Sequence, residues 1–266
     1  MRLFIRLLLL FIGVQSGVAQ SETCALRMAV ETDFPPHLIQ QDEAWTGLSV
    51  DLMALLATKV GCELKLINSP WLRSLQLSEQ GQLDVVSHLS FTPERQAHFA
   101  FIGPHHIESI YLIGDATQLP PLEQLAQLAD SVDLGSIATL HGGYYGETFE
   151  RLRKEPNFAS QLVVISSIQD KLALLRAGRV NVILEDISVV RYWQQHQYEE
   201  AERFQPLLKV YESPVYFGFS KASLSDAQIR KLADAWLQLY QQGKIAEVYR
   251  NYNLSLESDL TPTSQW

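Results

Sequence analysis

The sequence predicts an α/β protein of two lobes, each built on a mostly parallel sheet flanked by helices. Three observations carry this prediction. Apolar strand-like runs at 26–30 and 63–67 flank a Leu-rich helical segment at 48–60, and strands joined in this way pair in parallel. Further along, a second series of alternating strands and helices begins. Two extended aromatic segments, 108–115 and 210–220, connect the two series, and we expect them to be the crossings between the lobes.

Composition and charge limit the classes of partner. The chain has 266 residues, of which 47% are hydrophobic, so it is long enough to bury a sizeable core. Its formal net charge is −9. Because nucleic acids are polyanions that bind basic surfaces, an acidic balance of this size argues against a nucleic-acid partner.

Residues 1–19 have the pattern of a signal peptide. Arg2 and Arg6 supply positive charge, 7–14 is an apolar run, and small residues precede a cleavage position after Ala19. The apolar run is shorter than the roughly 20 residues that span a bilayer, so we predict export with cleavage rather than an anchor. Removal of both arginines leaves 19 basic against 30 acidic residues, a net charge of −11.

The two cysteines stand at matching places in the first strand–helix–strand unit. Cys24 precedes the strand-like run 25–30, and Cys62 precedes 63–67. Parallel neighbouring strands start side by side, so we predict a Cys24–Cys62 disulfide, which an export compartment permits. The alternative is a pair of free, buried thiols.

The first candidate ligand contacts follow the first two strands. Phe34 lies in a loop that Pro35 and Pro36 force to be extended, where it is either a wall of a ligand site or part of the core. Trp71 and Arg73 begin the helix predicted at 70–80. We expect Trp71 to face the cleft or the core, and Arg73 to contact an anion or to be solvated.

The segment 81–104 is the strongest candidate site. Gly81 ends the preceding helix, and 83–89 is a buried strand. Ser90, Thr92 and Arg95 then stand at the carboxyl end of this strand, where small ligands bind in open α/β sheets. The planar guanidinium of Arg95 suits a carboxylate, and the two hydroxyls can bond its remaining lone pairs.

The second lobe contributes a glycine-rich loop. A surface helix at 122–128 and a strand at 132–138 precede the loop 139–146, which contains His141, Gly142 and Tyr144. Glycines allow a ligand to approach the backbone closely. No Gly-Lys-Ser/Thr follows, so this is not a phosphate-binding loop of the nucleotide-binding type.

Another acid ends a buried strand further along. After a strand at 163–165 and a helix at 167–177, the strand 180–184 is followed by Asp186. Asp186 is predicted either to bind a ligand ammonium or to cap the helix 187–195, and one side chain can do both. Helices at 224–242 and 245–252 close the chain. We therefore assign 20–112 and 216–254 to lobe 1, 113–215 to lobe 2, and 255–266 to a polar, frayed tail.

The motif Gly81-x-x-Asp84 with Ser90-x-Thr92-x-x-Arg95, followed by Phe-x-x-Pro at 101–104, resembles solute-binding protein family 3. These are the periplasmic substrate-binding proteins of polar amino-acid ABC transporters. The resemblance covers about 24–253 and implies the two-lobe type II periplasmic binding fold with two extended hinge crossings. It implies a monomer in the periplasm that closes about its hinge on a small amino acid or organic acid, for uptake or sensing. An inner-membrane ABC permease or a receptor would be the partner.

The resemblance also implies roles for single residues. Arg95 would bind the ligand carboxylate, Ser90 and Thr92 would complete its pocket, and Asp186 would bind the amine. Two departures from the family pattern, His88 and the loop that starts at His141, point to a divergent orphan branch whose ligand need not be an amino acid. Without an ammonium to bind, Asp186 would only cap its helix.

Two other classes compete with a binding protein. Some proteins of this fold are enzymes of the cyclohexadienyl dehydratase kind, and a freestanding sensory protein is a third possibility. Glu31, Asp33, Glu185, His88 and His141 could serve as general acids, but none shows a diagnostic spacing, so we predict no enzyme.

Metal chemistry is also not expected. The seven histidines include the pair His105-His106, but they show no His-x-x-x-His spacing and have no cysteine partner. We therefore predict neither a metal site nor a cofactor, with the histidines solvated or in the core.

Overall fold

A mixed sheet runs through the whole molecule. The computed structural model describes residues 24–31, 34–119, 122–125, 127–130, 134–196, 203–254, 256 and 260–265. The strands of the main sheet are β1 (Ala25–Val30), β4 (Glu63–Asn68), β5 (Val85–Ser90), β6 (Phe99–Asp115), β7 (Ile137–Leu140), β8 (Leu162–Ile165), β9 (Val182–Asp186), β10 (Phe204–Ser220) and β11 (Thr263–Gln265). Their order is β4-β1-β5-β10-β6-β9-β7-β8, with β11 beside β6. The predicted signal peptide lies outside the described residues.

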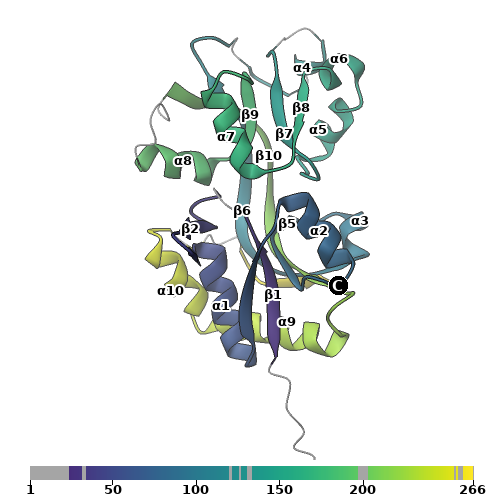
Figure 1. The fold of residues 1–266 in the computed structure, drawn as a ribbon, viewed down its shortest axis with the longest axis vertical. Coiled ribbons are helices and arrows are strands. Elements are labelled where there is room, and N and C mark those ends of the chain that lie inside the picture. The colour runs from purple at the N-terminus through teal and green to yellow at the C-terminus, as the bar shows by residue number, and fades with distance from the viewer. Residues whose placement is uncertain are drawn as a thin grey trace, which may run out of the picture.

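The long strands β6 and β10 connect two lobes. Figure 1 shows them passing between a lower group of elements, lobe 1, and an upper group, lobe 2. They pair with each other in antiparallel register from Phe99↔Ser220 to Asp115↔Phe204. In lobe 1, β10 pairs with β5, and in lobe 2, β6 pairs with β9. This arrangement confirms the predicted α/β fold with two extended crossings, and the predicted lobe boundaries fall within these two strands.

Lobe 1 is built on parallel strands. β1 pairs in parallel with both β4 and β5, as strands joined by helical crossovers do. The crossover helices are α1 (Leu48–Val60) and α2 (Trp71–Glu79), and the short α3 (Pro93–Gln96) follows β5. A small hairpin of β2 (Ile39–Gln41) and β3 (Ala44–Thr46), which sequence patterning did not indicate, precedes α1.

Lobe 2 repeats this scheme with β7 paired in parallel to β8 and β9. Its helices are α4 (Gln127–Asp130), α5 (Glu147–Leu152), α6 (Pro156–Ala159), α7 (Ile168–Arg176) and α8 (Ile187–Gln195). Two expectations were wrong in detail: the helix expected at 122–128 is the single turn α4, and the strand expected at 132–138 starts later. Gly135 has a φ of 73°, a left-handed conformation that an extended strand does not accommodate, so β7 begins beyond it.

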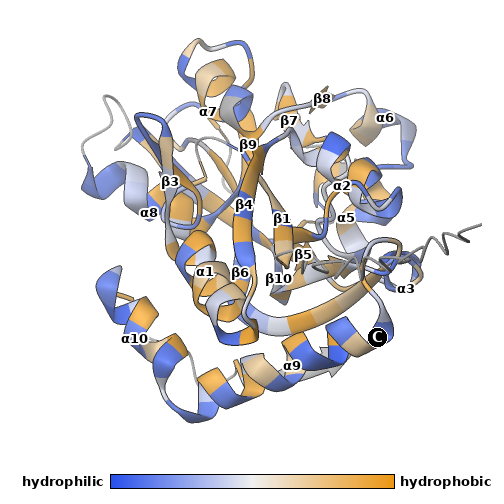
Figure 2. Cartoon of the chain, turned by 60° about the horizontal axis from the view of Figure 1, so that its bottom comes forward, coloured by the Kyte–Doolittle hydropathy of each residue, from blue (hydrophilic) through white to orange (hydrophobic). Residues whose placement is uncertain are grey.

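Two helices close lobe 1. α9 (Asp226–Gln241) and α10 (Lys244–Asn251) each carry hydrophobic and hydrophilic residues, and α9 lies across the bottom of the lobe in Figure 2. The apolar side of α9 buries Ile229, Leu232 and Trp236 in the core. Within the described part of the chain, no helix combines the length and the apolar character that crossing a bilayer requires.

The C-terminal segment differs from the predicted frayed tail. Leu260 is buried, and β11 pairs with β6 at residues 101–103. Along this stretch β10 occupies only one side of β6, while β9 pairs with it further on, at 110–114. The free edge offers unpaired backbone groups, and the tail satisfies them.

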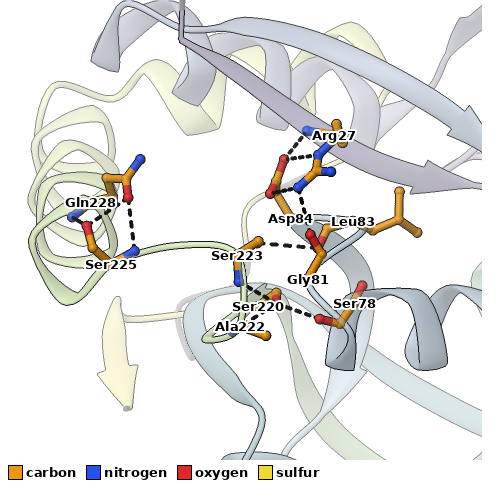
Figure 3. A network of polar contacts seen from close by, with 10 residues as sticks. All are labelled: Arg27, Ser78, Gly81, Leu83, Asp84, Ser220, Ala222, Ser223, Ser225 and Gln228. Atoms are coloured by element: carbon orange, nitrogen blue, oxygen red, sulfur yellow. Dashed lines mark hydrogen bonds and ion pairs between the residues drawn. The ribbon is translucent and has the colours of Figure 1, made fainter.

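A polar network ties the end of β10 to the sheet of lobe 1 (Figure 3). Arg27 donates to the Asp84 carboxylate from its backbone N–H and from its guanidinium, at 2.7–2.9 Å. The Ser220 hydroxyl donates to the carbonyl of Ser78 at 2.6 Å. The motif residue Asp84 thus has a structural role in the lobe.

The structure contains the predicted disulfide between Cys24 and Cys62. It joins the starts of two parallel neighbours, because Ala25 at the start of β1 pairs with Glu63 at the start of β4. The geometric argument from strand–helix–strand pairing was therefore correct.

Candidate functional site

A cavity lies between the two lobes, beside the ends of β1, β5 and β9. Its empty volume, counted together with the space open to solvent, is about 780 Å³. Lobe 1 and lobe 2 both supply polar side chains to its wall. These are Glu31, Ser69, Ser74, Ser87, His88, Ser90, Arg95, Glu108, Tyr144, Tyr145, Lys171 and Glu185.

Arg95 is the central cation of this wall. Thr92 caps the short helix α3 by accepting from the Arg95 N–H at 3.2 Å, with Pro93 in the first turn, and this fixes the position of the arginine. The guanidinium donates to the carbonyl of Ser90 at 2.9 Å and to the carbonyl of Gly142 at 3.0 Å. Burial lowers its pKa. Among the described residues it forms no ion pair, although the charge of Glu108 on the same cavity wall favours its protonated form.

The hydroxyl residues of the motif differ in position. Ser90 is buried and lines the cavity. Thr92 does not line it, because its side chain serves as the helix cap of α3. In this structure the Thr92 side chain positions Arg95, and its contact with a ligand carboxylate stays a prediction.

The two aromatic candidates of lobe 1 both line the cavity. Phe34 lines the cavity and is also buried against the core, and its role as a ligand wall stays a prediction. The indole N–H of Trp71 donates across the cleft to the carbonyl of Gly142 at 3.2 Å. Arg73, on the other side of the same helix, is exposed and does not line the cavity.

The glycine-rich loop meets lobe 1 through its backbone. The Gly142 carbonyl accepts from Trp71 and from Arg95, and Gly142 has a φ of 78°, which favours glycine. Tyr144 lines the cavity and packs edge-on against Tyr211, with ring centroids 5.5 Å apart. His141 is exposed and lies outside the cavity wall.

Asp186 is fully buried and does not line the cavity. It caps α8, with one oxygen accepting from the N–H of Ser188 at 2.7 Å, and the other accepts from the N–H of Ser109 at 2.8 Å. Burial alone would raise the pKa of Asp186, but the contacts with His106 and Ser188 outweigh it and lower the pKa to about 2. The helix-cap interpretation thus describes its position, whereas no contact with the cavity supports the ammonium role.

The neighbouring Glu185 reaches the cavity instead, because adjacent residues of β9 face opposite sides of the sheet. Its carboxylate pairs with the buried Lys171 of α7 at 2.6 Å. Burial would lower the pKa of Lys171, but Glu185 raises it, so the lysine stays charged. On β6, Glu108 also lines the cavity, and burial together with Asp186 and Glu185 raises its pKa to about 8.

Glu31 links the lobes at the edge of the cavity. One carboxylate oxygen accepts from the N–H of Trp71 at the start of α2, and the other accepts from the N–H of Ile168 at the start of α7, both at 2.9 Å. Negative charge is stabilised at helix N-termini, and burial raises the pKa of this carboxyl.

Sequence reasoning missed most of the charged lining. Glu31 and Glu185 had been noted only as candidate acids of an enzyme, and Glu108 and Lys171 had not been singled out. A usable signal existed for Glu185, because the alternation along a strand places it opposite Asp186. No local pattern marks Glu108, which lies in the long crossing strand β6.

Two lobes, two long connecting strands and a polar interlobe cavity define the class of two-lobed α/β ligand-binding proteins. The chain belongs to the bacterial extracellular solute-binding proteins, family 3, whose family model matches residues 26–255. The resemblance seen in the motif at 81–104 is thereby confirmed.

Solved structures agree on the fold. A histidine kinase sensor domain with similarity to periplasmic binding proteins aligns with a TM-score of 0.73 and 18% identity, over 88% of this chain and 98% of its own. The arginine-, lysine-, histidine-binding protein ArtJ from Geobacillus stearothermophilus gives 0.72 and 18%, over 88% and 98%. An ancestral amino acid-binding protein, AncCDT-1, described as a precursor of cyclohexadienyl dehydratase, gives 0.67 and 18%, over 86% and 94%.

Proposed function

We propose that the protein captures a small polar ligand bearing a carboxylate, an amino acid or a related organic acid, in the interlobe cavity. The observation that carries the proposal is Arg95. Its partly buried guanidinium lines the cavity and, among the described residues, donates only to neutral carbonyl oxygens. Buried charges are normally paired, and a ligand carboxylate matches the planar fork of an arginine.

The opposite end of the ligand would lie near the acids of the wall. Glu108 and Glu185 both line the cavity, on the two strands β6 and β9 that pair side by side. They are better placed than Asp186 to bind an ammonium, because Asp186 is committed to α8 and to Ser109. Trp71 and Tyr144 supply the aromatic walls.

The proposed setting is the periplasm, where the protein would act as a monomer. An inner-membrane ABC permease or a receptor would take the loaded form, for uptake or for sensing. The predicted signal peptide supports export, and the similar structures include both an amino-acid-binding protein and a kinase sensor domain. We propose binding without turnover, because two of the three acids that line the cavity are held in place, Glu185 by an ion pair with Lys171 and Glu31 by two helix N-termini.

A thermal-shift screen of the mature protein against amino acids, dipeptides, amines and small organic acids tests this proposal. A ligand at 100 times its Kd adds about 2.7 kcal/mol of stability. Calorimetry with a hit should show at least a tenfold loss of affinity, about 1.4 kcal/mol, in Arg95→Ala. The exposed Arg176 of α7, changed to Ala, is the matched control and should bind as the wild type does.

The outcomes separate the parts of the proposal. Equal affinity of Arg95→Ala and wild type would remove the carboxylate anchor. If the protein consumes a molar excess of the ligand, it is an enzyme and the proposal of binding without turnover is wrong. If only organic acids without an amino group bind, Arg95 remains the proposed carboxylate contact and the proposed ammonium contact is wrong.

A further inference from the structure

A cluster of four histidines lies where both lobes meet β6. Of the four, His88 lines the ligand cavity, and the other three do not. His37 follows β1, His88 is on β5, and His105 and His106 are on β6. The ring centroid of His37 lies 4.3 Å from that of His88 and 4.4 Å from that of His106. The ring centroids of His88 and His105 are 4.7 Å apart. Asp186 of β9 completes the cluster.

Three of these residues converge on one point. His37, His106 and Asp186 each offer one ligand atom, and these atoms all lie within 4.8 Å of one another. The centre of an equilateral triangle of that side is about 2.8 Å from each corner. Zinc bonds to histidine nitrogen and carboxylate oxygen measure about 2.0–2.2 Å, so inward shifts of less than about 1 Å would complete the coordination.

The carboxylate is already held in place by other groups. Ser109 and Ser188 donate their backbone N–H groups to its two oxygens, at 2.8 and 2.7 Å, and the Ser188 hydroxyl also donates to it. The His106 ring lies 3.4 Å from it, and the His37 ring is 2.9 Å from the Ser188 hydroxyl. Ligands that are oriented by such outer contacts are typical of metal sites.

Unpaired nitrogens form the second, independent observation. Both ring nitrogens of His88 are buried and have no hydrogen-bond partner among the described residues, and neither does Nδ1 of His37. His88 is 9% exposed and packs against His37. Buried polar atoms without partners are rare and destabilising. His37 is fully buried and belongs to the three-residue group, so its ring offers a nitrogen lone pair that a metal ion would accept.

We propose that His37, His106 and Asp186 bind a divalent transition-metal ion of the zinc type. Two imidazoles with a single carboxylate favour zinc, nickel or copper, whereas calcium and magnesium require oxygen ligands. The ion joins lobe 1 at His37, the crossing strand at His106 and lobe 2 at Asp186. It therefore fastens the lobes together beside the ligand cavity, to which His88 belongs.

The test uses zinc chloride alone, added to untagged protein that has been stripped of metal with a chelator. Calorimetry and metal analysis after dialysis should show one ion per chain. His106→Gln and, separately, His37→Gln should each weaken binding at least tenfold. His98→Gln, a change at an exposed histidine, is the matched control and should leave binding unchanged.

Circular dichroism verifies that each variant folds, and His37→Gln provides a second test if His106→Gln does not. Cobalt bound to the wild type should give the visible absorption of a nitrogen-ligated site, and His37→Gln should lose it. Absence of zinc binding by the wild type, or equal binding by all three variants, would overturn the proposal. Arg95→Ala should bind zinc normally, so failure of the organic-ligand proposal and failure of the metal proposal are separable.

Discussion

Glu31 is the one carboxylate of the described cavity wall that caps a helix in each lobe, and its substitution by glutamine tests whether it holds the lobes closed. Neither Pro70 nor Ser167, the residues before α2 and α7, forms a side-chain cap, so Glu31 supplies the acceptor for both helices. Glutamine has one carbonyl oxygen in place of two carboxylate oxygens, and its NH₂ group cannot accept a hydrogen bond from the second backbone N–H. One of the two hydrogen bonds is therefore lost, and the other loses its charge.

The magnitude follows from the bonds involved. A hydrogen bond to a charged group contributes about 1.5–3 kcal/mol, whereas a neutral one contributes about 0.5–1.5. The bond to Ile168 and the contact with the Ser167 side chain are the contributions of Glu31 that join the two lobes. Glu31→Gln should therefore cost the closed form about 1–3 kcal/mol. This corresponds to a shift of about 5- to 150-fold in the ratio of closed to open forms.

Small-angle X-ray scattering of the ligand-free protein measures this shift, because an open two-lobed molecule has a larger radius of gyration. We expect Glu31→Gln to be more extended than the wild type. Glu43→Gln, at an exposed acid in the β2–β3 turn, makes the same chemical change outside the cleft and should leave the radius unchanged. A Glu31→Gln variant as compact as the wild type would refute the role of this carboxylate in closure.

Two further predictions concern the stability of lobe 1. Replacing Cys24 and Cys62 with serine should lower the free energy of unfolding by about 4 kcal/mol, because the crosslink spans 38 residues and restricts the unfolded chain. In urea titrations, reductant should destabilise the wild type and have no effect on the double variant. Asp84→Asn should cost about 2 kcal/mol, less than a fully buried ion pair, because Arg27 is partly exposed. Burial would raise the pKa of Asp84, but the hydrogen bonds from Arg27 outweigh it and lower the pKa. The wild type should therefore lose the stability contributed by the Asp84 carboxylate as pH falls below about 4. The free energy of unfolding of Asp84→Asn should fall less steeply over the same pH range.

The fold was predictable from the sequence because its signals are local. Strand–helix–strand spacing indicated the parallel pairing of β1 with β4, and with it the disulfide. The Ser-x-Thr-Pro-x-Arg turn identified a strand end followed by a capped helix, which is how Thr92 and Arg95 are arranged. Asp186 as a helix cap follows from the same kind of rule.

The charged lining was not predictable in the same way, since it depends on which side of a strand a residue faces and on contacts distant in sequence. Glu185 and Asp186 differ by one position and point to opposite sides, so a strand end alone does not identify the cavity acid. The interlobe contact of Glu31 joins residues 137 positions apart. The histidine cluster likewise escaped the spacing rules for metal sites, because His106 and Asp186 are 80 residues apart.

Closure and ligand capture involve the same groups in this cleft. The guanidinium of Arg95 donates across the cleft to the Gly142 carbonyl, and the proposed ligand carboxylate would compete with this interlobe contact for the guanidinium N–H groups. The exchange is favourable because a charged acceptor binds a guanidinium about twice as strongly as a neutral one. A ligand shifts the lobe equilibrium only by the difference between its affinities for the two forms. Trp71 keeps a second bond to the Gly142 carbonyl, and Glu31 keeps its bond to Ile168, so the cleft can stay closed while Arg95 changes partner. If Arg95 changes partner on binding, the closed form therefore loses one interlobe bond and keeps those of Trp71 and Glu31.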